Sequence, residues 1–137
     1  MSAPAPTIHG NAARQQPAVA ERLLEQARHG LLEAEYASRP VDRYAGAHLA
    51  ALRAAAAVLA VRTRARRRSK PTSAWTLLAT VAPELGEWAA FFAAGSATRV
   101  AAEAGVTRLV SAGDADELVC RTGQFLGLAD RAVHGTS

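Results

Sequence analysis

The stretch VDRYAGAHLAALRAAAAVLAV, residues Val41 to Val61, decides the fold that we predict for this chain. It is rich in alanine, the residue with the highest intrinsic helix propensity, and its apolar positions recur every three or four residues. The predicted core face comprises Val41, Ala45, His48, Leu52, Ala55 and Leu59, widened by Leu49 and Ala56. The pattern predicts one buried helix over residues 41–63.

A cationic segment follows this helix directly. Six of the sixteen Lys and Arg residues of the protein fall in this segment, namely Arg62, Arg64, Arg66, Arg67, Arg68 and Lys70. The rest of the chain holds ten cations and twelve acids, so the formal net charge of +4 comes from this segment. We interpret residues 62–72 as a basic loop that Pro71 closes.

The basic loop favours RNA or DNA as a partner. A localised positive patch on a near-neutral body attracts polyanions, and each Arg can bind a phosphate through two hydrogen bonds. Since no aromatic residue lies between residues 62 and 74, we expect binding that is independent of sequence and sensitive to salt. The alternative is a solvated loop that only keeps an apolar bundle soluble.

Length and composition indicate a single all-α domain. The chain has 137 residues, and half of them are hydrophobic, which is enough to bury a core. Aromatic residues make up only 5%, and runs of β-branched residues are missing. We therefore predict an up-down antiparallel bundle of four main helices plus one or two short helices.

Other classes of protein are less compatible with the sequence. Cys120 is the single cysteine, which excludes an intrachain disulfide, and no His lies at metal-ligand spacing, so we predict no metal or other cofactor. Residues 1–17 lack the pattern of a secretory signal, and no run approaches the roughly 18 uncharged apolar residues of a membrane span. We expect a cytoplasmic protein without a membrane partner.

The segment before the central helix divides into two parts. Residues 1–16 carry Pro, Gly and a Gln pair without periodicity and are predicted to form a disordered tail. The helical bundle is then expected over residues 17–135. Its first helix should cover about residues 18–37, with Pro17 in the first turn, where proline is well tolerated.

Beyond the basic loop, capping and breaking residues divide the chain into shorter helices. Ser73 can cap a third helix, which Pro83 should end before a further helix over residues 84–94. A short helix is expected from there to Glu103, ended by Gly105.

The last helix has a start and a stop signal. Asp114 lies three residues before Glu117, a variant of the capping box, and Gly135 should stop the helix. Gly123 and Gly127 form a strip of small residues on it, which would admit another helix, from this chain or from a second subunit.

The aromatic residues are expected to be structural. Four of them lie at helical spacing beside aliphatic residues, which favours a core over a ligand pocket: Trp75, Trp88, Phe91 and Phe92. Tyr36 and Tyr44 flank the first helix junction, and we expect them to pack there.

Three segments resemble HEPN domains (higher eukaryotes and prokaryotes nucleotide-binding), in particular a small actinobacterial subfamily. They are residues 42–56 (DRYAGAHLAALRAAA), residues 73–92 (SAWTLLATVAPELGEWAAFF) and residues 115–126 (ADELVCRTGQFL). The likeness covers about residues 18–134. It implies an α-helical up-down bundle, often dimeric. Many members are metal-independent endoribonucleases, commonly toxins or defence effectors, and others are binding or regulatory modules without catalysis. For a toxin-like member the expected partner is a protein antitoxin.

Active members of that family use an Arg-x(4–6)-His motif, usually completed across a dimer. This chain has one formal match, Arg43-x4-His48, and no match in the last helix. In the family the His is the acid or base on the ribose 2′-hydroxyl, and the Arg stabilises phosphate charge. In one unbroken helix, however, side chains five residues apart diverge. A core histidine, bonded inside the bundle or at a dimer seam, is therefore the favoured interpretation of His48.

Three functions follow from the sequence. The leading hypothesis is a binding or accessory module that associates with nucleic acid through the basic loop and does not catalyse. The second is a metal-independent, toxin-like ribonuclease that uses Arg43 and His48. The third is a scaffold whose helical surface binds another protein. A homodimer is a separate expectation that the resemblance implies.

Overall fold

The computed structural model of the protein describes residues 8–63, 73–106 and 110–135, and it describes side chains from residue 17 onward. The predicted all-α architecture is confirmed, because the described residues form six α-helices and one short 3₁₀-helix and contain no strand. In chain order these are α1 (Ile8–Tyr36), α2 (Pro40–Arg62), α3 (Ala74–Val81), η1 (Pro83–Leu85), α4 (Gly86–Ala94), α5 (Ser96–Glu103) and α6 (Ala112–His134).

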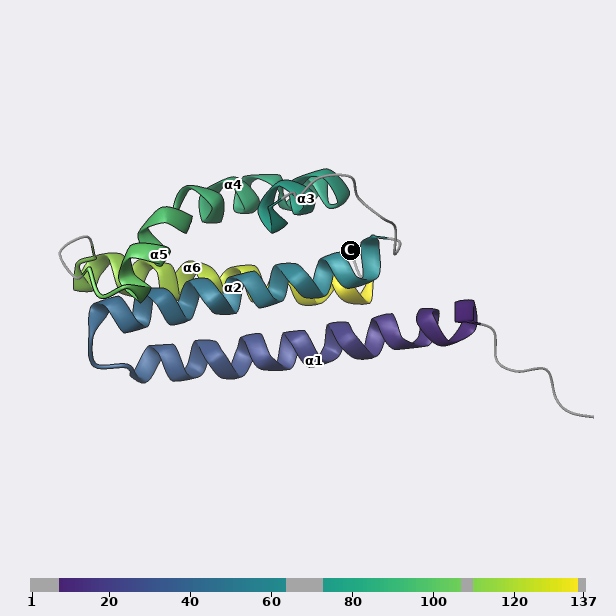
Figure 1. Ribbon diagram of the computed structural model, residues 1–137, viewed down its shortest axis with the longest axis horizontal. Helices are drawn as coiled ribbons and strands as arrows, with labels where there is room; N and C mark the ends of the chain where they lie inside the picture. Colours follow the sequence, from purple (N-terminus) through teal and green to yellow (C-terminus); the bar gives the residue numbers. More distant parts are fainter. Residues whose placement is uncertain (1–7, 64–72, 107–109, 136–137) are drawn as a thin grey trace, which may run out of the picture.

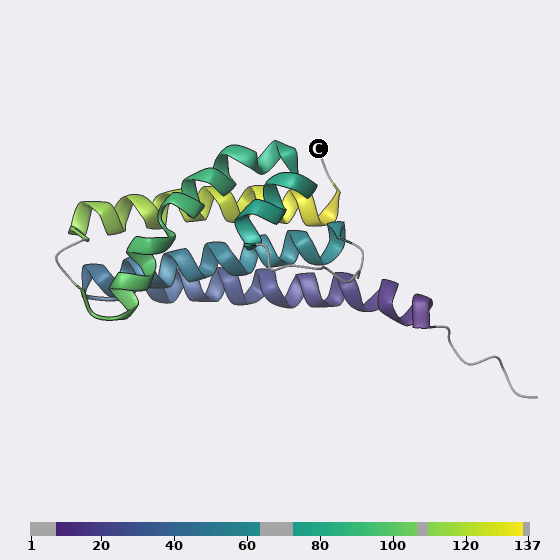
Figure 2. The same cartoon turned by 45° about the horizontal axis from the view of Figure 1, so that its top comes forward.

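The helices form a bundle in which short helices fill one of the four positions. The long helices α1, α2 and α6 lie side by side, and α1 runs opposite to the other two (Figures 1 and 2). Helices α3, α4 and α5 lie across α2 and α6 and together take the place of the third long helix of a four-helix bundle. The breaks occur at Pro83, which cannot continue a helix, and at Gly95, which separates α4 from α5.

Helix α2 lies at the centre of the bundle. No residue from Arg43 to Val61 is exposed, since α2 packs against α1, α6, α3 and α5. The predicted core residues Val41, His48 and Ala55 are buried. The core face is wider than predicted and includes Ala47, Ala50, Ala51, Ala54, Ala57 and Val58, whereas Ala45, Leu52 and Leu59 are only partly buried. Small side chains occupy the closest contacts because they let helix axes approach.

Helix α2 is also apolar enough, by length and composition, to cross a membrane. Its most apolar window has a mean hydropathy of 1.5, which is contrary to the prediction that the chain contains no such segment. In the structure 44% of that window is buried within the bundle. Its central position explains this composition, because the core helix of a helical bundle has the same properties as a candidate span.

Helix α1 is longer than predicted. It begins at Ile8, not near residue 18, so Pro17 lies inside the helix and residues 8–16 belong to α1, not to the predicted disordered tail. Residues 1–7 lie outside the described part of the chain. The prediction placed Pro17 in the first turn, where proline is best tolerated, whereas α1 contains Pro17 in its interior.

The predicted helix ends are mostly confirmed. The Ser73 hydroxyl accepts a hydrogen bond from the backbone N–H of Thr76 at the start of α3. Gly105 follows α5 with φ of +91°, and Gly135 follows α6 with φ of +72°, the left-handed conformation that glycine adopts at helix ends. The capping box of α6 consists of Ser111 and Asp114, not of Asp114 and Glu117, so α6 begins two residues before the predicted capping residue.

Aromatic rings from three helices form the centre of the core. The rings of Trp75 and Phe92 stack with centroids 5.0 Å apart, and Phe125 lies 5.1 Å from Phe92. Trp75 and Phe92 are buried as predicted, but Phe91 is partly exposed under the guanidinium of Arg121.

The two tyrosines at the first helix junction differ in burial. Tyr44 packs against the core as predicted, whereas the prediction for Tyr36 was wrong, since it is 82% exposed.

Candidate functional site

His48 is the buried polar group at the contact of α2 with α3 and α4. Its side chain is 1% exposed, and its Nε2 lies 2.9 Å from the backbone carbonyl oxygen of Phe92. The imidazole meets the rings of Trp75 and Phe92 edge-on, with centroid distances of 6.0 and 5.8 Å. These contacts fix the ring within the aromatic core.

The hydrogen bond to Phe92 determines which nitrogen of His48 carries the proton. Because a carbonyl oxygen only accepts, Nε2 donates and Nδ1 is left as the acceptor of a neutral imidazole. Nδ1 is buried and has no hydrogen-bond partner among the described residues. Burial lowers the pKa of His48 below its usual value, and the positive charge of Arg99 acts in the same direction. The ring is therefore neutral at pH 7.

Arg43 makes contacts of its own on another side of α2. Its Nη1 donates to the carbonyl oxygens of Ala37 and Ser38 at 3.0 and 3.3 Å, and its Nε lies 3.2 Å from a carboxylate oxygen of Asp116. The guanidinium thus joins the α1–α2 connection to the beginning of α6. Arg43 and His48 share none of these partners, as the helical geometry of their spacing predicted.

The arginine whose charge acts on His48 comes from a different helix. Arg99 on α5 lowers the pKa of the imidazole, while its Nη1 lies 2.8 Å from a carboxylate oxygen of Glu103. Arg99 could not be identified from the sequence, because 51 positions separate it from His48 and no motif links them.

A surface cavity of about 290 Å³ borders His48. Tyr44, Gly95 and Thr98 line it together with His48, at the meeting point of α2, α4 and α5. Burial raises the pKa of Tyr44, so its hydroxyl is protonated at neutral pH. The cavity combines the neutral polar groups of Tyr44, His48 and Thr98 with aromatic walls, and none of the described residues that line it is Asp, Glu, Lys or Arg.

The structure describes only one side chain of the predicted basic site. Arg62, at the end of α2, lies 2.6 Å from a carboxylate oxygen of Glu84 and 3.4 Å from the carbonyl oxygen of Val81. This ion pair ties α2 to η1, and the hydrogen bond from Arg62 lowers the pKa of Glu84. The other predicted residues, Arg64, Arg66, Arg67, Arg68 and Lys70, lie outside the described residues.

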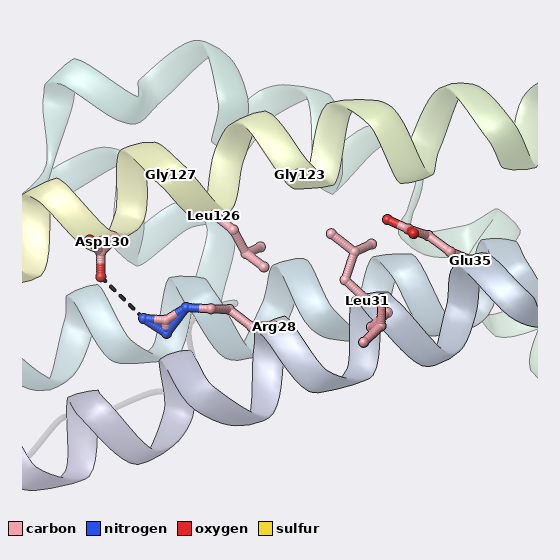
Figure 3. Close-up of a pocket in the computed structure, with 8 residues that line it drawn as sticks. Arg28, Leu31, Glu35, Gly123, Leu126, Gly127 and Asp130 are labelled. Atoms are coloured by element: carbon pink, nitrogen blue, oxygen red, sulfur yellow. Dashed lines mark hydrogen bonds and ion pairs between the residues drawn. The ribbon is translucent and has the colours of Figure 1, made fainter.

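A second surface hollow lies between α1 and α6 (Figure 3). It is a groove of about 360 Å³, lined on α1 by Arg28, Leu31 and Leu32 and on α6 by Gly123, Leu126 and Gly127. The predicted strip of small residues thus lies in this groove, and both glycines are exposed to solvent.

The remaining candidate groups form no reactive cluster. Cys120 is exposed. His29 lies 3.3 Å from Glu33, and His134 contacts Glu21 and Asp130. Within residues 8–63, 73–106 and 110–135, no three His, Cys, Asp or Glu side chains are placed to hold a metal ion.

Comparison with known protein families gives a match. A family model described as SAV_6107-like HEPN matches residues 34–130, which is more than half of the chain. The matched region runs from the end of α1 into α6, so it includes Arg43, His48 and the basic segment. No curated protein and no solved structure matches the chain.

Proposed function

The chain belongs to the SAV_6107-like HEPN family, and from this premise we propose that it is a binding or accessory module that associates with nucleic acid without cleaving it. The observation that carries the proposal is the distribution of charge. The whole net positive charge of the protein comes from the six cations Arg62, Arg64, Arg66, Arg67, Arg68 and Lys70. Such a segment binds phosphates by releasing counterions, with little dependence on base sequence.

The contacts of Arg62 within the protein exclude it from the residues that we propose to bind nucleic acid. Its guanidinium is engaged with Glu84 and Val81, so its role is to hold the end of α2 against η1. The contacts to nucleic acid are assigned to the five cations that follow, at the point where the chain leaves α2. In the sequence these five cations follow the last residue of α2 within eight positions.

The burial and the hydrogen bond of His48 support a function without catalysis. A general base needs an accessible nitrogen within about 3 Å of the substrate hydroxyl. In this protein Nε2 is bonded to Phe92, and the side chain is 1% exposed. Arg43, the formal partner in the motif, is bound to Ala37, Ser38 and Asp116.

Fluorescence anisotropy with a labelled single-stranded RNA tests the proposed binding. We expect wild-type affinity to fall steeply between about 50 and 200 mM salt. The triple variant Arg66→Ala, Arg67→Ala and Arg68→Ala should bind more weakly, and its slope of log affinity against log salt should be shallower by about 2. Equal affinity before and after this change would contradict the proposal.

A matched control removes the same charge elsewhere. Arg22, Arg121 and Arg131 are exposed on α1 and α6, and their replacement by Ala also lowers the net charge by three. We expect this variant to keep most of its affinity for RNA. If both triple variants lose affinity equally, binding depends on overall charge and not on the basic segment.

Incubation of the same RNA with the protein in a metal chelator tests for a ribonuclease. We expect intact RNA. Cleavage that is lost in His48→Gln and in Arg43→Gln, while both variants stay folded by circular dichroism, would replace the binding module with the metal-independent ribonuclease as the function.

A further inference from the structure

The cavity beside His48 lies at the break between α4 and α5. Helix α4 ends at Ala94, and α5 begins at Ser96. Just before this break, the carbonyl oxygen of Phe92 accepts hydrogen bonds from the backbone N–H of Gly95 at 3.1 Å and from Nε2 of His48 at 2.9 Å. The buried imidazole thus holds the end of α4 against α2, so this wall of the cavity is fixed before any ligand binds.

Two hydroxyl groups line the cavity from different helices. Tyr44 lies on α2 and Thr98 on α5. Burial raises the pKa of Tyr44, and a hydrogen bond with the Thr98 side chain partly opposes this rise. A single hydrogen bond between two hydroxyls leaves one of their donors and several of their acceptor sites free. The pair can therefore both donate to and accept from one neutral polar group of a ligand.

The rest of the cavity wall is apolar and largely aromatic. The rings of Phe91 and Phe92 meet at 76° with centroids 5.1 Å apart, and Ala94 and Leu118 complete the lining. Phe91 is 37% exposed, so part of its ring is open to a further contact. Aromatic rings attract another ring edge to face or in an offset stack. These walls favour an aromatic ligand over an aliphatic one.

Size and charge restrict the ligand further. A volume of about 290 Å³ is at the lower end of the range for small-molecule sites, which indicates a single ring with few substituents. The described lining residues include no Asp, Glu, Lys or Arg. A charged group would lose its hydration there without gaining an ion pair, which disfavours charged ligands, nucleotides among them.

We propose that the cavity at the meeting point of α2, α4 and α5 binds a small uncharged phenol. The hydroxyl of the ligand exchanges hydrogen bonds with Tyr44 and Thr98, and its ring packs against Phe91 and Leu118. A concave apolar site with a few convergent polar groups is the usual form of a small-molecule site. The proposed binding of nucleic acid neither requires this ligand nor supplies it.

Titration of the ¹⁵N-labelled full-length protein with para-cresol, followed by NMR, tests the proposal. We expect the amide signals of Gly95 and Thr98 to shift and to saturate with a dissociation constant of about 0.1–1 mM. Toluene lacks the hydroxyl and para-hydroxybenzoate carries a carboxylate, so each should bind at least about fivefold more weakly. Unchanged amide signals at about 5 mM para-cresol, or equal affinity for toluene, would overturn the proposal.

Two substitutions of nearly unchanged size test the hydroxyl pair. Tyr44→Phe and Thr98→Val each remove one hydroxyl from the cavity, so each should weaken para-cresol binding about fivefold. Tyr36→Phe and Thr80→Val remove the same groups from exposed positions outside the cavity and should leave the affinity unchanged. If the two cavity variants fold and bind as tightly as the wild type, the proposal is wrong.

A pair of glycine variants tests the space itself. A Cβ at Gly95 would lie 3.0 Å from the Tyr44 hydroxyl oxygen and 3.7 Å from Cδ2 of His48, so Gly95→Ala should weaken binding more than about fivefold. Gly86→Ala is the control, since a Cβ there would meet no atom within 4 Å. Equal affinity in the two variants would show that the ligand binds elsewhere. Because no nucleic acid is present, failure here is independent of the proposed binding through residues 62–70.

Discussion

The imidazole of His134, at the end of α6, forms a hydrogen bond with the carboxylate of Glu21 on α1. Its other nitrogen, Nδ1, lies 2.8 Å from the backbone carbonyl oxygen of Asp130. Both partners only accept hydrogen bonds, so both ring nitrogens must donate, and only the protonated imidazole can do this. The geometry thus selects the charged form of His134 at the contact between two long helices.

The His134 contact should make stability depend on pH. The hydrogen bond that His134 donates to Glu21 raises the pKa of His134 above its usual value. Because the folded protein holds this proton more tightly, the stabilisation is complete below about pH 6.5 and is lost as the pH rises through the raised pKa. Thermal unfolding should therefore show that His134→Gln lowers the Tm more at about pH 5.5 than at about pH 8.5.

His29→Gln provides the control for this measurement. His29 is also exposed, but its partner Glu33 lies on the same helix, so this ion pair joins no two helices. We expect little change in Tm at either pH. A loss in His134→Gln that is the same at both pH values would contradict the role of the protonated ring.

His48 should affect stability with the opposite sign. Burial lowers the pKa of His48, so the unfolded chain binds this proton more readily and stability falls as the pH drops below about 6.5. Replacement of the buried ring in His48→Ala removes its packing and its bond to Phe92, which should cost about 2–4 kcal/mol in urea unfolding near neutral pH. This variant should also lose less stability than the wild type between about pH 7 and pH 5.

Gly46 and Gly127 should respond oppositely to the same substitution. A Cβ at Gly46 would lie 3.0 Å from the Cβ of Ala34, where α1 and α2 cross, while one at Gly127 would meet no atom within 4 Å. We expect Gly46→Ala to destabilise the fold by about 1–3 kcal/mol through overpacking. Gly127→Ala should stabilise the monomer by about 0.5–1 kcal/mol, since alanine favours the helix.

A second substitution, at Ala34, tests whether overpacking between α1 and α2 causes the loss of stability in Gly46→Ala. Ala34→Gly should recover part of the loss in Gly46→Ala, because it removes the atom that the new Cβ would approach. Chemical denaturation of the single and double variants at one protein concentration gives this coupling. If Gly46→Ala costs the same stability with and without Ala34→Gly, the contact between α1 and α2 at these residues is not tightly packed.

The sequence predicted the helices better than their lateral packing. Spacing and composition identified α2 as a buried helix, and single residues such as Ser73, Pro83 and Gly105 located helix ends, because these effects are local. The width of the buried face of α2 depends on how many helices surround it. The number of surrounding helices is a property of the whole bundle. The single periodic face in the sequence therefore underestimated the width of the buried face.

The candidate site was predictable only in part. Helical geometry correctly separated Arg43 from His48, because both lie on one element with known rise and rotation. The cavity that His48 borders requires Gly95 and Thr98 from other elements, and the influence of Arg99 requires the fold of α5 against α2. Nothing in their sequence spacing could indicate these relationships.

The capping box at the start of α6 gives a prediction on helix stability. The Ser111 hydroxyl accepts from the backbone N–H of Asp114 at 3.0 Å, and the Asp114 carboxylate accepts from the backbone N–H of Ser111 at 3.1 Å. Ser111→Ala should lower the free energy of unfolding by about 1 kcal/mol. The double variant with Asp114→Ala should lose less stability than the sum of the losses in the two single variants, because both hydrogen bonds belong to one capping box. Ser38→Ala, at an exposed serine between α1 and α2, is the matched control, and losses that simply add would contradict this coupling.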